Sequence, residues 1–253
     1  MKAIFLGDIH GRSIWQSIVA NEKDADIFLF LGDYFDSKES ISGPKQLENF
    51  RQIIAFKQAA ESQGKQVVLL FGNHDFHYMP WHTREPYSGY QKTMAPKIQK
   101  ALLEHFEQFQ MAYSFDDVLC SHAGISSIWL HRNIGPEGEV GKWMRGDLQS
   151  IVAAVNRLFL EKPKAFDSQG FDSSGDEPQQ TPIWIRPYSL VKANVDIMEP
   201  HCRQVFGHTR MKDLDKNWLE VMELWNGRYI ATDGLHLGAY WIYDSGEFQR
   251  KLI

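Results

Sequence analysis

Short apolar runs recur along the chain, and each ends at a glycine or serine followed by a polar residue. The runs are rich in Ile, Val, Leu and Phe and lack polar alternation, which predicts strands that are buried on both faces. They cover residues 3–6, 27–31, 67–71, 118–120 and 205–206. The residues that follow them are Gly7-Asp8, Gly32-Asp33, Gly72-Asn73, Ser121-His122 and Gly207-His208.

Helical patterns lie between several of these runs, over residues 13–22, 44–63 and 96–109. The second of them carries Pro44 in its first turn and Gly64 just past its end, as helices often do. Alternating strands and helices predict a parallel or mixed sheet with helices on its faces. In such sheets ligands bind beyond the carboxyl ends of the strands. Each glycine or serine with its following polar residue lies at such an end.

The last part of the chain has a different pattern. Short apolar runs at 218–224, 228–232, 238–243 and 247–252 are joined in part by the tight-turn pairs Asn226-Gly227 and Ser245-Gly246. This predicts an antiparallel meander that forms part of a second sheet. The segment 162–181 is polar and rich in turn residues, and we expect it to be a surface loop. The length of 253 residues favours a single domain over 1–253.

Composition narrows the class of protein. The net charge of -5 gives no bulk attraction to nucleic acid or to an anionic membrane. The two cysteines, Cys120 and Cys202, form no CxxC pair, which argues against a thiolate zinc site or a disulfide framework. The first apolar run is too short for a signal peptide, and no stretch approaches a membrane span. We therefore expect a cytoplasmic protein that binds neither membranes nor nucleic acid.

The polar residues at the strand ends share a chemistry. Taken singly, each is explained by turns or helix caps, but turns do not favour His. Imidazole nitrogen with carboxylate and amide oxygen, and no sulfur, suits manganese, iron or zinc. A carboxylate can bridge two ions, and two ions about 3.5–4 Å apart can hold a phosphoryl group and activate water. The residues are Asp8, His10, Asp33, Asp36, Asn73, His74, Asp75, His122 and His208.

In order along the chain, these segments resemble the five motifs of the calcineurin-like metallophosphoesterases. More narrowly they resemble the phosphoprotein phosphatase branch, which includes bacterial protein phosphatases and diadenosine tetraphosphatases. The resemblance implies a four-layer α/β/β/α sandwich with two mixed β-sheets. The segments are Gly7-Asp8-Ile9-His10-Gly11, Gly32-Asp33-Tyr34-Phe35-Asp36, Gly72-Asn73-His74-Asp75, His122-Ala123-Gly124 and Gly207-His208.

The resemblance also implies roles for the matching residues. Asp8 and His10 would bind a first metal ion, and Asp33 would bridge to a second. The second ion would be held by Asn73, His122 and His208. His74 would protonate the leaving group, and Asp36 would orient His74. This pairing is chemically sound, because His is a suitable acid near neutral pH and a carboxylate favours its protonated form.

The chain departs from the phosphoprotein phosphatase pattern at two arginines that grip phosphate in that branch. Ser37 follows Asp36, and Phe71 precedes Gly72, where arginines are expected. Arg186, Arg210 and Arg12 are the candidates to replace them, since a guanidinium fork suits phosphate oxygens. Arg210 also stands where the broader family has a second His, which predicts a more hydrated first metal.

Together these features predict an enzyme that hydrolyses phosphate esters by attack of a metal-bridging hydroxide, with His74 as general acid. Two divalent ions are expected, with Mn²⁺ favoured and iron or zinc as alternatives. A phosphomonoesterase of serine/threonine protein phosphatase type is the first hypothesis, and a dinucleoside polyphosphate hydrolase is the alternative. A non-catalytic metal-binding scaffold is disfavoured, because a scaffold needs no acid pair. The partner would be a phosphoprotein or nucleotide; the oligomeric state stays open.

Overall fold

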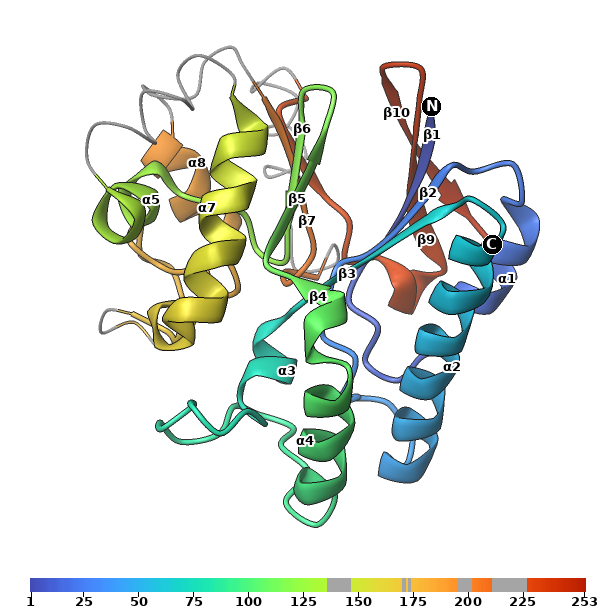
Figure 1. Cartoon of the computed structure of the whole chain (residues 1–253), viewed down its shortest axis with the longest axis horizontal. Coiled ribbons are helices and arrows are strands. Elements are labelled where there is room, and N and C mark those ends of the chain that lie inside the picture. Colours follow the sequence, from blue (N-terminus) through green and yellow to red (C-terminus); the bar gives the residue numbers. More distant parts are fainter. Residues whose placement is uncertain (136–146, 170–171, 173, 195–201, 211–226) are drawn as a thin grey trace. The chain divides into compact units, whose positions relative to one another are not determined.

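The computed structural model describes residues 1–135, 147–169, 172, 174–194, 202–210 and 227–253 (Figure 1). The chain divides into two compact units, Met1–Phe109 with Thr232–Ile253, and Gln110–Ala231. The single-domain organisation stays a prediction. Over the described residues, no helix combines the length and the apolar character that crossing a membrane requires.

The first unit is built on a six-stranded sheet with the order β10-β9-β1-β2-β3-β4. Strands β1, β2 and β3 are parallel, whereas β9 runs antiparallel to β1 and β10 antiparallel to β9. The strands are β1 (Lys2–Leu6), β2 (Ile27–Phe30), β3 (Gln66–Leu70), β4 (Phe109–Gln110), β9 (Ala239–Asp244) and β10 (Glu247–Leu252). The helices are α1 (Trp15–Asn21), α2 (Gly43–Ser62), α3 (Asn73–Phe76), α4 (Ala95–Glu104), η1 (Phe106–Gln108) and η4 (Leu235–Leu237).

Helices α1 and α2 cover one face of this sheet at β2. Phe28 and Phe30 point to the same face because side chains alternate along a strand. The ring of Trp15 lies 5.6 Å from that of Phe30, and Phe56 of α2 lies 5.4 Å from Phe28. Trp15 and Phe56 also contact each other at 5.5 Å. Aromatic contacts of this kind add to the burial of large apolar surfaces, so they fix both helices on the sheet.

A buried carboxylate ties the end of α1 to three strands. Glu22 Oε2 lies 2.7 Å from Lys2 Nζ of β1, and its Oε1 accepts hydrogen bonds from Tyr240 of β9 and Lys251 of β10 at 2.7 and 2.8 Å. Burial by itself would raise the pKa of Glu22, but the hydrogen bonds from Lys2, Lys251 and Tyr240 outweigh it and lower that pKa to about 2.

The second unit contains a four-stranded sheet with the order β5-β6-β7-β8, in which β5 is antiparallel and the others are parallel. Asn156 of α7 fastens this helix to β5, because its side chain bonds to Met111 N and to both polar backbone groups of Ala112. The elements are β5 (Ala112–Phe115), β6 (Val118–Ser121), α5 (Ser127–Ile134), α7 (Leu148–Glu161), η2 (Pro163–Phe166), α8 (Pro187–Asn194), β7 (Arg203–Phe206) and β8 (Tyr229–Ala231).

The prediction of an α/β fold with two mixed sheets is confirmed. All five predicted buried strands are present, in register as parallel neighbours within their sheets, and the helices over 13–22 and 44–63 are found as α1 and α2. The stacking of the sheets into four layers stays a prediction. The described part of 162–181 contains η2, and Phe166 within it is buried against Trp129 with ring centroids 5.1 Å apart.

The helix predicted over 96–109 is too long at its C-terminal end. Helix α4 ends at Glu104, and a 3-10 turn then leads into β4, which starts at Phe109. The ring of Phe109 lies 5.7 Å from Tyr34 and 5.2 Å from Phe71. This aromatic core takes Phe109 out of the helical pattern, because packing outweighs local helix propensity.

The C-terminal antiparallel meander is wrong as a single element. Strand β8 pairs with β7 in parallel, in the four-stranded sheet. Strands β9 and β10 form a hairpin in the other sheet, beside β1. Their turn has Ser245 and Gly246 at φ 52° and 100°, as the turn pair predicts. The strand predicted over 218–224 lies outside the described residues.

Replacing Glu22 with Gln should weaken the first unit. Because the pKa of Glu22 is lower in the folded chain than the unfolded value of 4.5, the carboxylate stabilises the fold above that pH. This stabilisation is lost as the pH falls toward 2. We expect Glu22→Gln to lower the free energy of unfolding by about 2 kcal/mol at neutral pH, measured by urea titration, with the difference shrinking in acid.

Glu48→Gln is the matched control. Glu48 forms an exposed pair with Arg51 at 4.0 Å and accepts an exposed hydrogen bond from Gln52 at 3.4 Å, so its removal should change the unfolding free energy by about 0.5 kcal/mol or less. A difference between Glu22→Gln and the unaltered chain that stayed constant into acid would contradict the assigned role of the carboxylate.

Candidate active site

Three predicted metal ligands lie together in the first unit, where β1 and β2 end. Asp8, His10 and Asp33 each place one ligand atom so that all three lie within 4.8 Å of one another. His10 Nε2 is 3.9 Å from Asp8 Oδ2 and 3.7 Å from Asp33 Oδ2. All three side chains are buried. The structure therefore brings two carboxylates and an imidazole together at the carboxyl ends of β1 and β2.

The hydrogen bonding of His10 fixes which nitrogen can bind a metal. Its Nδ1 lies 2.7 Å from the carbonyl oxygen of Phe35, which can only accept a hydrogen bond, so Nδ1 carries the proton. The lone pair is then on Nε2, the atom that faces the two carboxylates. Burial holds the pKa of His10 well below its usual range, and the nearby His74 lowers it further. A neutral ring with an oriented lone pair is what a metal ligand requires.

The electrostatics of Asp33 fit a cation at this point. Burial raises the pKa of Asp33 well above its usual range, and the Asp8 carboxylate adds to this effect while His74 opposes it. Two adjacent carboxylates in a buried site are costly unless a positive charge compensates them. The donor set of two carboxylates and one neutral imidazole thus suits a divalent metal ion both chemically and electrostatically.

A His–Asp pair lies beside this ligand set. His74 Nδ1 is 3.0 Å from Asp36 Oδ2, and the His74 ring centroid is 5.2 Å from that of His10. Burial by itself would lower the pKa of His74, but the carboxylates of Asp33 and Asp36 outweigh it and raise that pKa. Burial would likewise raise the pKa of Asp36, but hydrogen bonds from His74 and His77 bring it to about 2. The pair therefore favours an ionised Asp36 and a protonated His74.

Asp75 holds the two neighbouring loops in place. Its Oδ2 accepts hydrogen bonds from the backbone N–H of Asp33 and of Gly72, at 2.8 and 3.0 Å, and its Oδ1 accepts one from Tyr34 at 2.9 Å. The motifs assign Asp75 no role of its own. The sequence does carry a signal for this role of Asp75. Asp75 lies three positions after Gly72, the N-cap of α3, which is the spacing of a capping box.

Position 72 requires a glycine because Asp33 lies so close to it. A Cβ atom at position 72 would lie 2.2 Å from Asp33 Oδ1 and 2.5 Å from Asp33 N, far inside van der Waals contact. Asp33 Oδ1 also accepts a hydrogen bond from His74 N at 2.9 Å. The start of α3, which carries the buried Asn73, therefore lies directly against the carboxylate of Asp33.

The candidate site residues adopt unusual backbone conformations. Among the described residues, six that are not glycine have positive φ, and four of them are site candidates. These are His10, Asp33, Asp36 and His208, at φ 43°, 54°, 61° and 62°. Such conformations cost about 1–3 kcal/mol each and concentrate at functional sites, where the surrounding structure maintains them.

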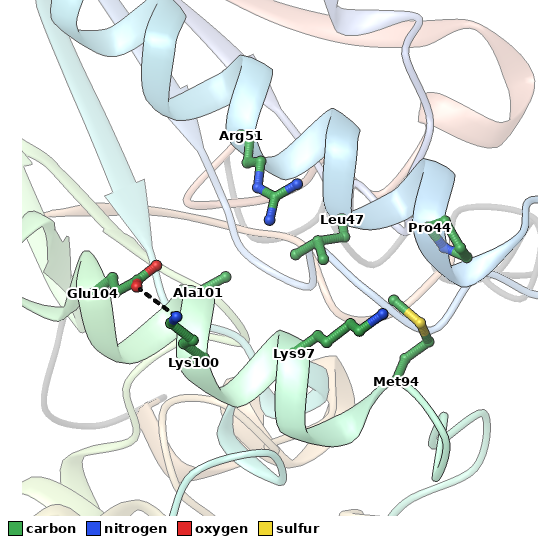
Figure 2. A pocket seen from close by; sticks show the side chains of 8 residues that line it. All are labelled: Pro44, Leu47, Arg51, Met94, Lys97, Lys100, Ala101 and Glu104. Atoms are coloured by element: carbon green, nitrogen blue, oxygen red, sulfur yellow. Dashed lines mark ion pairs between the residues drawn. The ribbon is translucent and has the colours of Figure 1, made fainter.

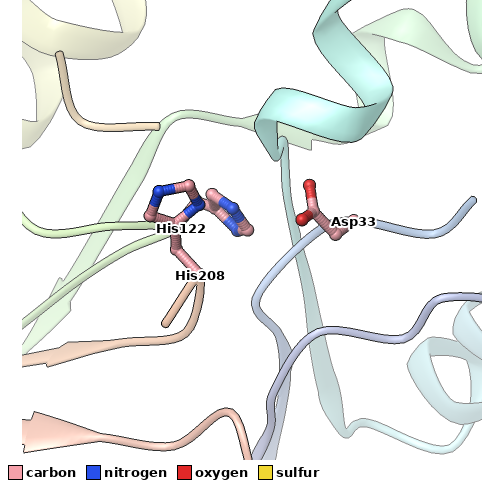
Figure 3. A group of neighbouring side chains, drawn as sticks. All are labelled: Asp33, His122 and His208. Atoms are coloured by element: carbon pink, nitrogen blue, oxygen red, sulfur yellow. The ribbon is translucent and has the colours of Figure 1, made fainter. Parts of the chain in front are cut away.

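The second unit brings His122 and His208 together. They follow the adjacent parallel strands β6 and β7, and Gly207 N donates to His122 O at 2.8 Å. Their ring centroids are 5.1 Å apart, and Figure 3 shows the two imidazoles side by side. His208 Nε2 lies 3.0 Å from the carbonyl oxygen of Trp184 and so carries the proton, which leaves Nδ1 as the ligand nitrogen. The pair fits a borderline metal ion.

Arg186 is anchored to the loop that carries His208. Its Nη1 donates to His208 O at 3.3 Å and to Thr209 Oγ1 at 3.1 Å, and its Nε donates to Ser174 O at 2.6 Å. These bonds orient the guanidinium beside a predicted metal ligand. A role in phosphate binding stays a prediction for Arg186 and for Arg210, which is half-buried two residues after His208.

Arg12 is engaged within the protein. Its Nε donates to Glu39 Oε1 at 2.6 Å, its Nη1 donates to Asp8 O at 3.1 Å, and the side chain is buried. These contacts favour a role in holding the Asp8 loop. Phosphate binding by Arg12 stays a prediction, and it would require the guanidinium to exchange some of these contacts.

A groove of about 610 Å³ lies between α2 and α4 (Figure 2). Leu47 and Ala101 contribute apolar surface, and the ion pair of Lys100 with Glu104 at 3.7 Å lies on its α4 side. None of the predicted metal ligands or acid-pair residues lines this groove. The catalytic assignment therefore stays with the loops after the strands.

The fold and the ligand sets define a class: a mixed α/β enzyme whose metal-binding loops follow parallel strands. The profile of the calcineurin-like phosphoesterase family matches residues 1–221. The chain belongs to this family of metal-dependent enzymes that hydrolyse phosphate esters. A search of curated protein sequences gives no significant match.

Solved structures share the fold at low sequence identity. The cold-active protein-tyrosine phosphatase of a psychrophilic Shewanella species is 19% identical with a TM-score of 0.64, over 99% of this chain and 77% of the other. A protein serine/threonine phosphatase from Saccharomyces cerevisiae is 13% identical with a TM-score of 0.51, over 100% of this chain and 80% of the other. These similarities concern the fold.

Replacing Asp75 with Asn should loosen the site without removing a metal ligand. The substituted amide would keep one acceptor oxygen, while its NH₂ group would face backbone N–H groups that now donate to a carboxylate. We expect a loss of about 1.5–3 kcal/mol in the free energy of unfolding, together with weaker Mn²⁺ binding. Urea titration and calorimetric Mn²⁺ titration measure the two effects. Asp24→Asn, at an exposed carboxylate, is the control. Equal effects of the two substitutions would contradict the role of Asp75 in holding the two loops.

Proposed function

We propose that this protein is a dinuclear-metal phosphomonoesterase in which His74 is the general acid. One observation carries the proposal: a buried His74–Asp36 pair, 3.0 Å apart, lies beside the Asp8–His10–Asp33 ligand set. A ligand set alone would serve a scaffold equally well. A proton donor next to it has a use only if a leaving group must be protonated, because general acids act on the reacting bond.

The proposed metal ligands are residues of the five sequence motifs. We assign the ligands of two divalent ions to Asp8, His10, Asp33, Asn73, His122 and His208. Asp33 would help to hold both ions, since a carboxylate has two oxygens. When bound, the ions would supply positive charge for the phosphoryl oxygens and lower the pKa of water, which is the chemistry that phosphate hydrolysis requires.

The chain's own residues would divide the remaining work. His74 would hold a proton on the ring nitrogen that does not face Asp36 and deliver it to the leaving oxygen. Asp36 would fix the ring through Nδ1, so that Nε2 points to the substrate. Arg186 would bind phosphate oxygens, which is supported by its anchored guanidinium beside His208. Arg210 would add positive charge near the same loop.

Mn²⁺ is the proposed metal, with iron and zinc as alternatives. Carboxylate, amide and imidazole ligands without sulfur suit all three ions, and oxygen-rich sites favour manganese. The proposed substrates are phosphorylated proteins. The names of the two phosphatases with similar folds support this direction, since both denote enzymes that act on proteins.

A substrate panel tests the proposal. The purified chain with added Mn²⁺ should hydrolyse p-nitrophenyl phosphate and release phosphate from phosphoserine, phosphothreonine or phosphotyrosine peptides. Diadenosine tetraphosphate is the alternative arm, and preference for it by kcat/KM would replace the proposed substrate class. Chelation with EDTA should abolish activity and Mn²⁺ should restore it. No turnover of any member of the panel would overturn the proposed function.

Replacing His74 with Asn separates the acid from the ligands. We expect kcat to fall by about 10²–10⁴-fold, because the proton donor is lost, while the bound metal stays at the level of the unaltered chain. Elemental analysis of the purified variant measures metal content. The matched variant is Asp33→Asn, which should lose metal together with activity. Equal loss of metal in both variants would mean that His74 is a ligand.

A further inference from the structure

Asp36 is bonded to more groups than the acid pair requires. Besides His74, its Oδ2 lies 2.7 Å from His77 Nε2. Its Oδ1 accepts hydrogen bonds from the hydroxyl of Tyr78 at 2.5 Å and from Gln91 Nε2 at 3.3 Å. All of these side chains belong to the first unit. The calcineurin-like motifs account for Asp36 and His74 and leave the other three residues without a role.

The hydrogen bonding of His77 determines its proton arrangement. Tyr87 N donates to His77 Nδ1 at 3.0 Å, so Nδ1 holds a lone pair. The ring proton must then be on Nε2, the atom that lies 2.7 Å from Asp36 Oδ2. The ring is buried and stacks on that of Tyr87, with centroids 5.1 Å apart and planes tilted by 24°. Burial also lowers the pKa of His77, which agrees with a neutral ring that has one donor and one acceptor.

The hydroxyl of Tyr78 is oriented in the same way. It accepts a hydrogen bond from Gln91 N at 2.9 Å, so its own hydrogen points to Asp36 Oδ1. The ring of Tyr78 stacks on Tyr90 at 4.9 Å. Each oxygen of Asp36 therefore lies against a polar side chain, His77 or Tyr78, that is itself held by the backbone of the segment 87–91.

The segment 87–91 also packs directly on Asp36. Gly89 has φ +90°, and a Cβ atom there would lie 3.1 Å from Asp36 Cβ. Asp36 itself has φ 61°, an unfavourable conformation for a residue with a side chain. The backbone of Asp36 is thus held by its surroundings, and its carboxylate is fixed by donors on both oxygens.

We infer that His77 and Tyr78 are positioning residues, which hold the Asp36 carboxylate so that Oδ2 faces His74 Nδ1. The inference rests on the proposed role of His74 as general acid. Without the two donors, the carboxylate would rotate about its side-chain torsions, and the His74 ring would lose its fixed direction. A catalytic acid must be held close to its productive geometry by such supporting contacts, because small displacements slow proton transfer.

A purely structural role for His77 is the competing explanation. Its ring also contacts those of Tyr78, Tyr90 and His82, in a buried aromatic cluster. Loss of the ring could lower activity by loosening this cluster alone. The test therefore needs a readout that depends on the proton donor and not on packing.

Leaving-group dependence is that readout. His77→Leu should lower kcat on phenyl phosphate, whose leaving group needs a proton, by about 10–100-fold. On 2,4-dinitrophenyl phosphate, whose leaving group departs without one, the loss should be about threefold or less. His77→Gln should recover most of the activity on phenyl phosphate, because the Gln amide can donate from about the position of Nε2. His82→Leu, which removes another ring of the same cluster, should affect both substrates alike.

A double substitution decides whether His77 acts through Asp36. On the Asp36→Asn background, His77→Leu should add about threefold or less to the loss, since coupled residues are not additive. A full additional loss on that background, or equal losses on the two aryl phosphates, would overturn the inference. Tyr78→Phe should behave as His77→Leu does.

Nitrogen-15 NMR of the histidine side chains gives a test that needs no turnover. His77 in the unaltered chain should show a protonated Nε2 and an unprotonated Nδ1, and His77→Leu should shift the His74 Nδ1–H resonance, whereas His82→Leu should leave it in place. The opposite tautomer of His77, or an unchanged His74 resonance, would overturn the inference whatever the activity. Absence of turnover with the expected spectra would instead count against the proposed function.

Discussion

Three backbone N–H groups point at the buried carboxylate of Asp75, and the geometry of the loops that carry the candidate site in the first unit depends on that convergence. The donors are Gly72, Asp33 and Tyr34. The first belongs to the loop after β3 and the other two to the loop after β2. Buried N–H groups are costly when unpaired, so one acidic side chain that satisfies three of them binds both loops together. The close fit of Gly72 against Asp33 follows from the same approach of the loops.

The loops that Asp75 secures hold residues in conformations that a free chain would avoid. His10, Asp33 and Asp36 all have positive φ, and each directs its side chain into the site. Without the surrounding bonds, these residues would relax to extended or helical backbone and the ligand set would separate. The strain is therefore balanced by hydrogen bonds of the fold.

The charges of the first unit fall into two neighbouring groups with different requirements. Asp8 and Asp33 are acidic groups whose ligand atoms lie within 4.8 Å of each other, which suits a cation, while Asp36 already lies against His74, His77 and Tyr78. Buried carboxylates of the same residue type thus differ in their pKa because their neighbouring groups differ. In the proposed function, this division would separate metal binding from proton delivery, although both groups lie next to His74.

The chemistry of the candidate site was predictable from sequence because it depends on residue type and order. Buried strands read as apolar runs, and the ligands and the acid pair follow them at the strand ends. The corrections come where local pattern and packing disagree. Phe109 continues a helical pattern but is taken into an aromatic core, and the C-terminal strands divide between two sheets. A strand's pattern shows that it is buried; it does not show which edge it joins.

The sequence by itself determined the family, the order of the motifs and the types of the ligands. Only the tertiary structure decided which nitrogen of His10 and His208 is available, and that Asp75 holds the loops. It alone placed His77, Tyr78 and the segment 87–91 around Asp36. The reason is physical: a tautomer or a supporting hydrogen bond depends on atoms from segments far apart in the chain, such as Phe35 beside His10 and Tyr87 beside His77. Folding brings these atoms together, and no local pattern records the contact.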